Sequence, residues 1–241
     1  MSAVRRKLIK LPPPTTCSII KRLNRFVVLV ECSGRERRAY ITNTGRLREL
    51  IVKGVTAYCI QKPAGRTDYW LIAVEEVKGP ALIDTRLQEE AFAVAVNSSL
   101  IPWLRGFKVV SRNPRMGSST FDYLLQNEEG EVLITELKSA VLRTGPRGEY
   151  ASYPDCRSLR GERHLRDLIA LADEGMRVAV VFVTTLHGIK AFIPYDEGDP
   201  EIRALLRKLR EAGGLVKALS IHYDPRESTV TLGKAEVPVL L

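Results

Sequence analysis

Three residues able to do metal and phosphate chemistry interrupt apolar stretches within 119–140. Asp122 stands in "STFDYLLQ", and Glu136 and Lys138 stand in "EVLITELKSA". Residues two apart in a strand face the same side, so Glu136 and Lys138 should project together. A hairpin turning at 127–130 would bring Asp122 into the same neighbourhood. Two converging carboxylates beside an ammonium suit Mg²⁺ or Mn²⁺, because such hard cations take oxygen ligands and leave positions for water and substrate phosphate.

This pattern predicts roles for all three side chains. Asp122 and Glu136 would be metal ligands. Lys138 would orient or help deprotonate a water, or neutralise charge that develops at a phosphate. The alternative is a hairpin with ordinary polar residues on its solvent face, and the spacing alone leaves both interpretations open.

The elements around these residues predict a mixed α/β or α+β domain with a central sheet. Expected helices cover 85–96, with Thr85 as N-cap, 158–175 and 199–214. In the second helix, Leu165 and Leu168 should face the core, and His164 should lie toward the polar side. The expected strands are 107–112, 120–126, 131–140, 177–186, 215–224 and 228–241.

The N-terminal part differs in texture and charge. Residues 1–67 hold 15 Lys or Arg against three acids, whereas the remaining 174 residues hold 22 against 25. Strand candidates at 25–32, 37–44, 50–61, 68–77 and 80–84 predict a small barrel of the OB type. The first 16 residues are expected to be loosely ordered. We therefore expect a basic nucleic-acid-binding domain at 1–84 and a second domain at 85–241.

The segregated charge favours a polyanionic partner, DNA in single- or double-stranded form first and an anionic membrane surface second. Surface ion pairing in a heat-adapted protein is the plainer alternative. The basic candidates of the barrel are Lys21, Arg22, Arg25, Arg46 and Arg48.

A further group lies at the start of the helix over 158–175. Arg160 and Arg163 add positive charge where backbone N–H groups attract anions, so a substrate phosphate would fit there. His164 would donate to that phosphate or act as a general acid or base. Helix capping and surface charge would account for the same residues.

Several classes of protein are disfavoured. No run of about 18 apolar residues predicts a membrane span, and the N-terminus lacks a signal-peptide pattern. Cys17, Cys32, Cys59 and Cys156 are scattered, which favours reduced thiols and a cytoplasmic location over a disulfide framework or a zinc site. Motifs of P-loop, dinucleotide-binding, nucleophile-elbow and zincin enzymes are absent.

Six short motifs, in the correct order along the chain, resemble one known family. They are "IIKRLNRF" at 19–26, "TNTG" at 42–45, "TFDYLL" at 120–125, "TELKSAVL" at 135–142, "YPDCRSLRGERHLRDL" at 153–168 and "PVLL" at the C-terminus. Together they make the sequence similar to the sugar fermentation stimulation protein family over nearly its whole length.

The resemblance implies an OB-like domain followed by a restriction-endonuclease-like domain with a PD-(D/E)XK core. It also implies DNA binding and a link to regulation of sugar use. The family motifs place the metal-site pattern on Asp122, Glu136 and Lys138, and they match Glu90 to a helical glutamate that many such nucleases add. Thr120, Ser139 and Arg163 depart from the family pattern, and Thr120 weakens any claim about phosphate contacts beside Asp122.

The leading hypothesis is a cytoplasmic DNA-binding protein with a Mg²⁺- or Mn²⁺-dependent nuclease site. The alternatives are a DNA-binding regulator of sugar metabolism that does not cut, and an RNA-binding or RNA-processing protein. A membrane partner is not expected, and homo-oligomerisation is left open.

Overall fold

The computed structural model describes residues 6–241, which divide into two compact units. The first comprises 6–91, Thr185–Gly188 and Ile221–Gly233, and the second comprises Phe92–Thr184, Ile189–Ser220 and Lys234–Leu241. No helix within residues 6–241 is long and apolar enough to cross a membrane.

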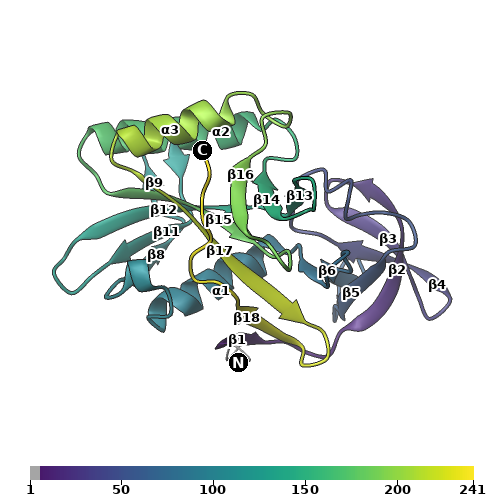
Figure 1. Cartoon of the computed structure of the whole chain (residues 1–241). Helices are drawn as coiled ribbons and strands as arrows, with labels where there is room; N and C mark the ends of the chain where they lie inside the picture. Colours follow the sequence, from purple (N-terminus) through teal and green to yellow (C-terminus); the bar gives the residue numbers. More distant parts are fainter. Residues whose placement is uncertain (1–5) are drawn as a thin grey trace. The chain divides into compact units, whose positions relative to one another are not determined.

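The first unit contains a closed five-stranded barrel. Its strands are β2 (Thr15–Asn24), β3 (Val27–Cys32), β4 (Arg35–Tyr40), β5 (Thr56–Gln61) and β6 (Tyr69–Val74). Antiparallel pairing runs from β4 through β3, β2 and β5 to β6, and a parallel β4–β6 pairing closes the ring. Every second residue of β3 is buried, which supplies the barrel core. The predicted OB-type barrel is confirmed, and Figure 1 shows it in purple and blue.

Two predictions for this region were wrong. The first barrel strand is β2, which the sequence analysis did not identify, and 80–84 contributes only the short β7 (Ala81–Leu82) outside the ring. Residues 6–10 were expected to be loosely ordered but form β1 (Arg6–Lys10), which pairs with β18 (Thr229–Leu232). Lys7 also bonds Glu227 at 3.2 Å. This order depends on a partner more than 200 residues away, which local sequence does not reveal. Residues 1–5 lie outside the described part of the chain.

A disulfide joins Cys17 and Cys32, so the prediction that all four cysteines are reduced was wrong. Antiparallel pairing sets Ser18 opposite Glu31, which makes Cys17 and Cys32 the next facing pair, with Cα atoms 4.5 Å apart. That spacing suits a cross-strand disulfide. The cysteines therefore no longer support a reducing, cytoplasmic location.

The second unit is built on the mixed sheet that the sequence predicts. Its strands are ordered β8 (Lys108–Arg112), β11 (Tyr123–Gln126), β12 (Val132–Ser139), β15 (Val178–Thr184) and β17 (Leu215–Asp224). The first three pair antiparallel, and β12, β15 and β17 pair parallel. All seven residues of β15 are buried, as expected of a central strand covered on both faces. Beyond Ser220, β17 continues in the first unit and pairs with β18.

Smaller elements complete this unit. A three-stranded sheet contains β13 (Leu142–Thr144), β14 (Tyr150–Tyr153) and β16 (Ala191–Pro194), and a short hairpin contains β9 (Arg115–Met116) and β10 (Ser119–Thr120). A 3₁₀ turn, η1, covers Pro102–Leu104. The α+β class with a mixed sheet is confirmed.

Helices cover both faces of the sheet. The helices α2 (Leu159–Asp173) and α3 (Ile202–Glu211) lie side by side in Figure 1. His164 of α2 contacts Glu136 of β12. Phe92, in α1 (Thr85–Asn97), packs on Tyr123 of β11 with ring centroids 5.8 Å apart. Tyr123 pairs with Thr135, the neighbour of Glu136, so it points to the opposite face.

The cap of α1 is Asp84, one residue before the predicted Thr85. The Asp84 carboxylate accepts from Leu87 N at 2.8 Å, from Thr42 Oγ1 at 2.7 Å and from Trp70 Nε1 at 2.5 Å. Asp84 is fully buried, and this burial raises its pKa despite the bonds. One carboxylate thus ties the barrel to the first turn of α1.

Replacing Asp84 by Ala should lower the free energy of unfolding by about 2–4 kcal/mol, because the cap is lost and the buried indole N–H loses its acceptor. Urea denaturation measures this change. The control is Glu49→Ala at an exposed acid, which should stay within about 0.5 kcal/mol of the parent. Equal stability of the two variants would show that the Asp84 contacts are not energetically important.

Thiol mapping should separate the cysteines into three classes. Cys156 is half-buried and should alkylate in the native protein. Cys59 is buried, and burial raises the pKa of its thiol to about 12, so it should react only after unfolding. Cys17 and Cys32 should require reduction. Mass spectrometry of alkylated peptides checks this, and four reactive thiols in an unfolded, unreduced sample would rule out the disulfide.

Candidate functional site

The β11–β12 hairpin brings Asp122 beside Glu136. Tyr123 pairs with Thr135, and Asp122 directly precedes Tyr123, so Asp122 comes next to Glu136 in the same register. The Asn127 side chain accepts from Glu131 N at 2.8 Å and closes the turn, while Gly130 takes a φ of +83° that favours glycine. This rigid turn sets which side chains meet at the far end of the hairpin.

Asp122 is anchored to the neighbouring strand. Its Oδ2 accepts from Leu137 N at 2.6 Å, and its side chain is half-buried. The bond fixes the carboxylate against β12 at the level of Glu136 and Lys138. The predicted convergence of these three residues is therefore present in the fold.

Glu136 is the centre of the group. Its Oε1 accepts from Lys138 Nζ at 2.5 Å and contacts His164 Nδ1 at 2.6 Å. The side chains of Glu136 and His164 are each only 4% exposed and that of Lys138 10%, so the interactions are well shielded from water. Arg160 Nε lies 3.5 Å from His164 Nε2, so His164 can carry its proton on Nδ1 and donate it to Glu136.

The charges of this group support one another. Burial alone would raise the pKa of Glu136, but the Lys138 ammonium and the His164 bond together lower it. Burial likewise opposes the charge of Lys138, but the Glu136 carboxylate outweighs it and raises the pKa of Lys138. Near neutral pH Glu136 is therefore ionised and Lys138 is a cation, which favours charge neutralisation over proton abstraction by Lys138 in this state.

The second oxygen of Glu136 provides a test of whether a metal fits. Glu136 Oε2 is buried and has no hydrogen-bond partner among the described residues. A buried carboxylate oxygen without a partner is costly, and a cation would satisfy it. Within residues 6–241, however, no three His, Cys, Asp or Glu side chains are grouped to hold a metal. A cation on Asp122 and Glu136 would thus take its other ligands from water and substrate, as Mg²⁺ commonly does.

The start of α2 differs from its prediction in one residue. Ser158 caps the helix by accepting from Gly161 N at 3.1 Å, and Arg160 and Arg163 are exposed as expected. His164 was expected toward the polar side but is buried on the sheet side of the helix. It lies one turn before Leu168, so the i, i+4 spacing was the signal that could have placed it there.

Glu162 is a buried acid that the sequence analysis missed. It bonds Arg157 at 2.7 Å and lies 3.7 Å from Arg166. These contacts hold the first turn of α2, which carries Arg160 and leads into the turn that contains His164. The (i, i+4) spacing of Glu162 and Arg166 was its only signal in the sequence.

The basic candidates of the barrel fall into two kinds. Lys21, Arg25, Arg46 and Arg48 are exposed, whereas Arg22 is half-buried. The Arg22 guanidinium donates to backbone carbonyls of Asn24, Arg25, Asn43, Gly45 and Arg46 at 2.5–3.1 Å. Arg22 therefore positions the 43–46 loop, and the exposed cations are the better candidates for phosphate contacts.

Glu90 lies in α1, two residues before Phe92, and is half-buried. It belongs to the first compact unit, whereas Asp122, Glu136 and Lys138 belong to the second. Its catalytic role stays a prediction.

Comparison with known proteins identifies the relatives of this fold. Residues 20–83 match the SfsA N-terminal OB domain, and residues 86–227 match the sugar fermentation stimulation protein RE domain. The chain belongs to the sugar fermentation stimulation protein family. The RE-domain match contains Asp122, Glu136, Lys138 and His164, and the OB-domain match contains the exposed cations of the barrel.

Relatives within the family are similar over almost their entire length. The sugar fermentation stimulation protein homolog of Pyrococcus furiosus is 43% identical over 97% of this chain and 100% of its own. The homolog of Archaeoglobus fulgidus is 42% identical over 98% of this chain and 100% of its own. The solved structure of Pyrococcus furiosus SfsA in complex with Ca²⁺ has a TM-score of 0.92, 42% identity and coverage of 98% and 99%.

His164→Ala should lower the free energy of unfolding by about 2–4 kcal/mol, because a buried hydrogen bond to a charged group is lost. His164→Asn should recover part of the loss, since its amide N–H can take the place of Nδ1–H. Arg163→Ala, an exposed neighbour, should stay within about 0.5 kcal/mol of the parent. Chemical denaturation measures all three, and an Asn variant no better than Ala would show that the bond to Glu136 does not stabilise the fold.

Proposed function

We propose that this protein binds DNA and hydrolyses its phosphodiester bonds with Mg²⁺ or Mn²⁺ at Asp122 and Glu136. The observation that carries the proposal is the buried, unpartnered Oε2 of Glu136, beside the anchored carboxylate of Asp122 and the Lys138 ammonium. A buried charge is normally paired and hydrogen-bonded through all its polar atoms, and one oxygen of this carboxylate is not. A bound cation would supply the missing partner.

The four residues of the site would have different roles. Asp122 and Glu136 would hold the cation, which would supply Lewis-acid stabilisation of the phosphate and activation of a water. His164 and Lys138 both contact Oε1 of Glu136, which leaves Oε2 for the cation. Because Lys138 stays protonated, it is suited to neutralise negative charge that grows on a phosphoryl oxygen in the transition state.

A divalent cation is consistent with the family. The solved structure of the Pyrococcus furiosus relative is a complex with Ca²⁺, a hard cation that takes oxygen ligands as Mg²⁺ does.

DNA would be held mainly through charge. The exposed cations Lys21, Arg25, Arg46 and Arg48 would contact it on the domain proposed at 1–84, and Arg160 and Arg163 would contact it on the domain proposed at 85–241. Contacts of this kind position the backbone and carry no sequence information.

A second candidate is a DNA-binding regulator of sugar metabolism that does not cut. The Glu136 carboxylate is already paired with Lys138 and His164 within the chain, which favours it because that charge is balanced without a cation. It predicts DNA binding that neither needs nor responds to a divalent cation.

Single-turnover assays on supercoiled, linear, single-stranded and branched DNA, with and without Mg²⁺ or Mn²⁺, test the proposal. The wild type should cleave at least one form only with metal. Glu136→Gln and Lys138→Ala should each slow cleavage by about 10²-fold or more, as expected when one preorganised transition-state group is removed. Their DNA affinity in EDTA should change by no more than a few-fold.

The matched controls are Glu128→Gln, an exposed acid in the turn of the same hairpin, and Lys208→Ala, an exposed cation on α3. Both should cleave like the wild type. A wild type inert on every DNA form with either metal would contradict the nuclease and favour the regulator. Full activity in Lys138→Ala would remove Lys138 from the mechanism.

A further inference from the structure

A groove of about 470 Å³ crosses the outer face of the barrel over β2, β3 and β4. Its floor follows from strand register, because Lys21 pairs with Leu29 and Leu29 pairs with Arg38. Directly opposed residues share one face, so these three form a row across three strands. All lining residues belong to the first unit, so the groove is a feature of the barrel alone.

One wall of the groove is fixed by hydrogen bonds. Arg38 N donates to Asp68 Oδ2 at 3.0 Å, and Asp68 N donates to Arg38 O at 2.8 Å. These bonds fix the Asp68 carboxylate and the backbone of Arg38, and the exposed Arg38 side chain adds a guanidinium to the lining. Glu36 adds a second carboxylate, and Arg37 adds a further cation.

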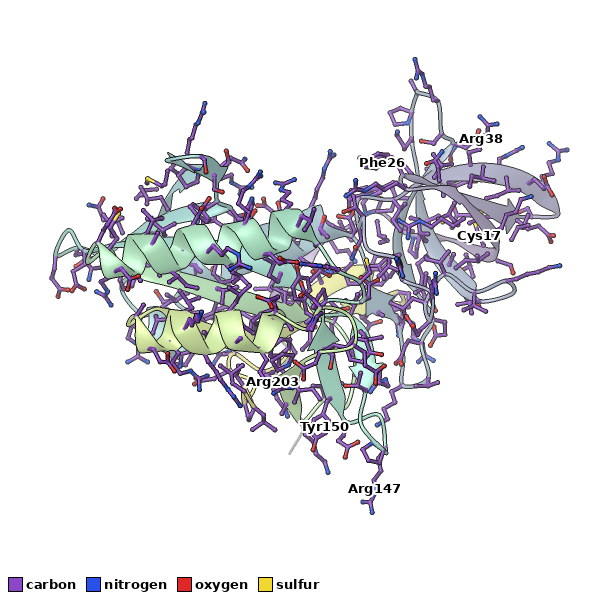
Figure 2. All side chains as sticks on the ribbon, turned by 90° about the horizontal axis from the view of Figure 1, so that it is seen from above. Cys17, Phe26, Arg38, Arg147, Tyr150 and Arg203 are labelled. Carbon is purple, nitrogen blue, oxygen red and sulfur yellow. A yellow bond between two sulfur atoms is a disulfide. The ribbon has the colours of Figure 1, made fainter. Side chains whose placement is uncertain are left out.

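Apolar surface lies between these charges. Leu23, in the lining, is 41% exposed, and Leu29 is half-buried. At the tip of the same β2–β3 hairpin, Phe26 is 46% exposed, and Arg25 lies 5.9 Å from its ring centroid. Phe26 and Arg38 are both labelled on the barrel in Figure 2. The hairpin thus exposes Leu23 in the groove lining, where Lys21 supplies a cation, and Phe26 at its tip, where Arg25 supplies another.

We propose that this groove binds single-stranded nucleic acid. Bases would pack on Leu23, Leu29 and Phe26, while phosphates would contact Lys21 and Arg38. Glu36 and Asp68 would accept hydrogen bonds from base amino groups. The inference rests on the proposed nucleic-acid binding but not on cleavage.

The mixture of groups in the groove favours a single strand over a duplex. A duplex presents mainly phosphates to an open groove, and its bases are stacked and paired, so the carboxylates in the lining would gain no hydrogen bond from base edges to offset their repulsion of phosphate. A single strand exposes base faces to apolar side chains and base edges to carboxylates, and such binding by aromatic platforms tolerates many sequences.

Fluorescence anisotropy in EDTA, with the full chain, tests the proposal. The probes are a labelled single strand, the same sequence as duplex, and polyphosphate as a competitor without bases. The wild type should bind the single strand more tightly than the duplex. Phe26→Ala should weaken single-strand binding about fivefold or more. Phe26→Leu should weaken binding almost as much, because it lacks the aromatic ring on which a base would stack.

Charge removal distinguishes the groove from general attraction. Lys21→Ala with Arg38→Ala should reduce the slope of log K against log salt for the single strand by about 1.4, as for two phosphate contacts. The control, Arg207→Ala with Lys208→Ala, removes the same charge from exposed positions on α3 and should leave the slope unchanged.

Three results would overturn the proposal: preference for duplex, equal slopes in both double variants, or displacement by polyphosphate as effective as by an unlabelled single strand. Because the assay contains no metal, it is independent of cleavage. A nuclease-inactive protein with groove-dependent binding would contradict the proposed hydrolysis and support the groove. An active nuclease whose binding does not depend on the groove would support hydrolysis and contradict the groove.

Discussion

The buried carboxylate of Glu136 imposes the constraint on which the candidate site depends. Removing an ion from water costs several kcal/mol, so a carboxylate that is 4% exposed persists only with compensating partners. Lys138 and His164 supply that compensation from β12 and α2. The protonation of Lys138 follows from this charge, and His164 adds a polar contact to the face through which α2 buries Leu165 and Leu168.

The same constraint links stability and function. Lys138 and His164 both satisfy Oε1 and leave Oε2 without a partner, so the pair stabilises the carboxylate incompletely. Incomplete satisfaction of this kind is uncommon in protein interiors, and a bound ion or water is one way to complete the set. Asp122 adds a second carboxylate whose direction is set by Leu137 N, a backbone group, so its placement does not depend on a flexible side chain.

The barrel shows a second use of register. Antiparallel pairing of β2 with β3 sets Cys17 against Cys32 and, a few residues along, Lys21 against Leu29. One ladder thus places a disulfide in the barrel and one side of the groove on its surface. The parallel β4–β6 pairing closes the ring beside Asp68, which bonds Arg38 and forms the groove wall.

Local sequence determined much of this protein by itself. Alternating and apolar runs predicted β8, β11, β12, β15 and β17, because burial of one or both faces of a strand gives its apolar residues a regular spacing in the sequence. The spacing of Glu136 and Lys138 predicted a shared face, and the turn at 127–130 predicted the approach of Asp122. Only the tertiary structure decided which distant residues meet: β1 with β18, Cys17 with Cys32, and His164 with Glu136. The physical reason is that strand register, disulfide formation and buried ion pairing depend on closeness in space, and periodicity describes the face of an element without naming what packs against it.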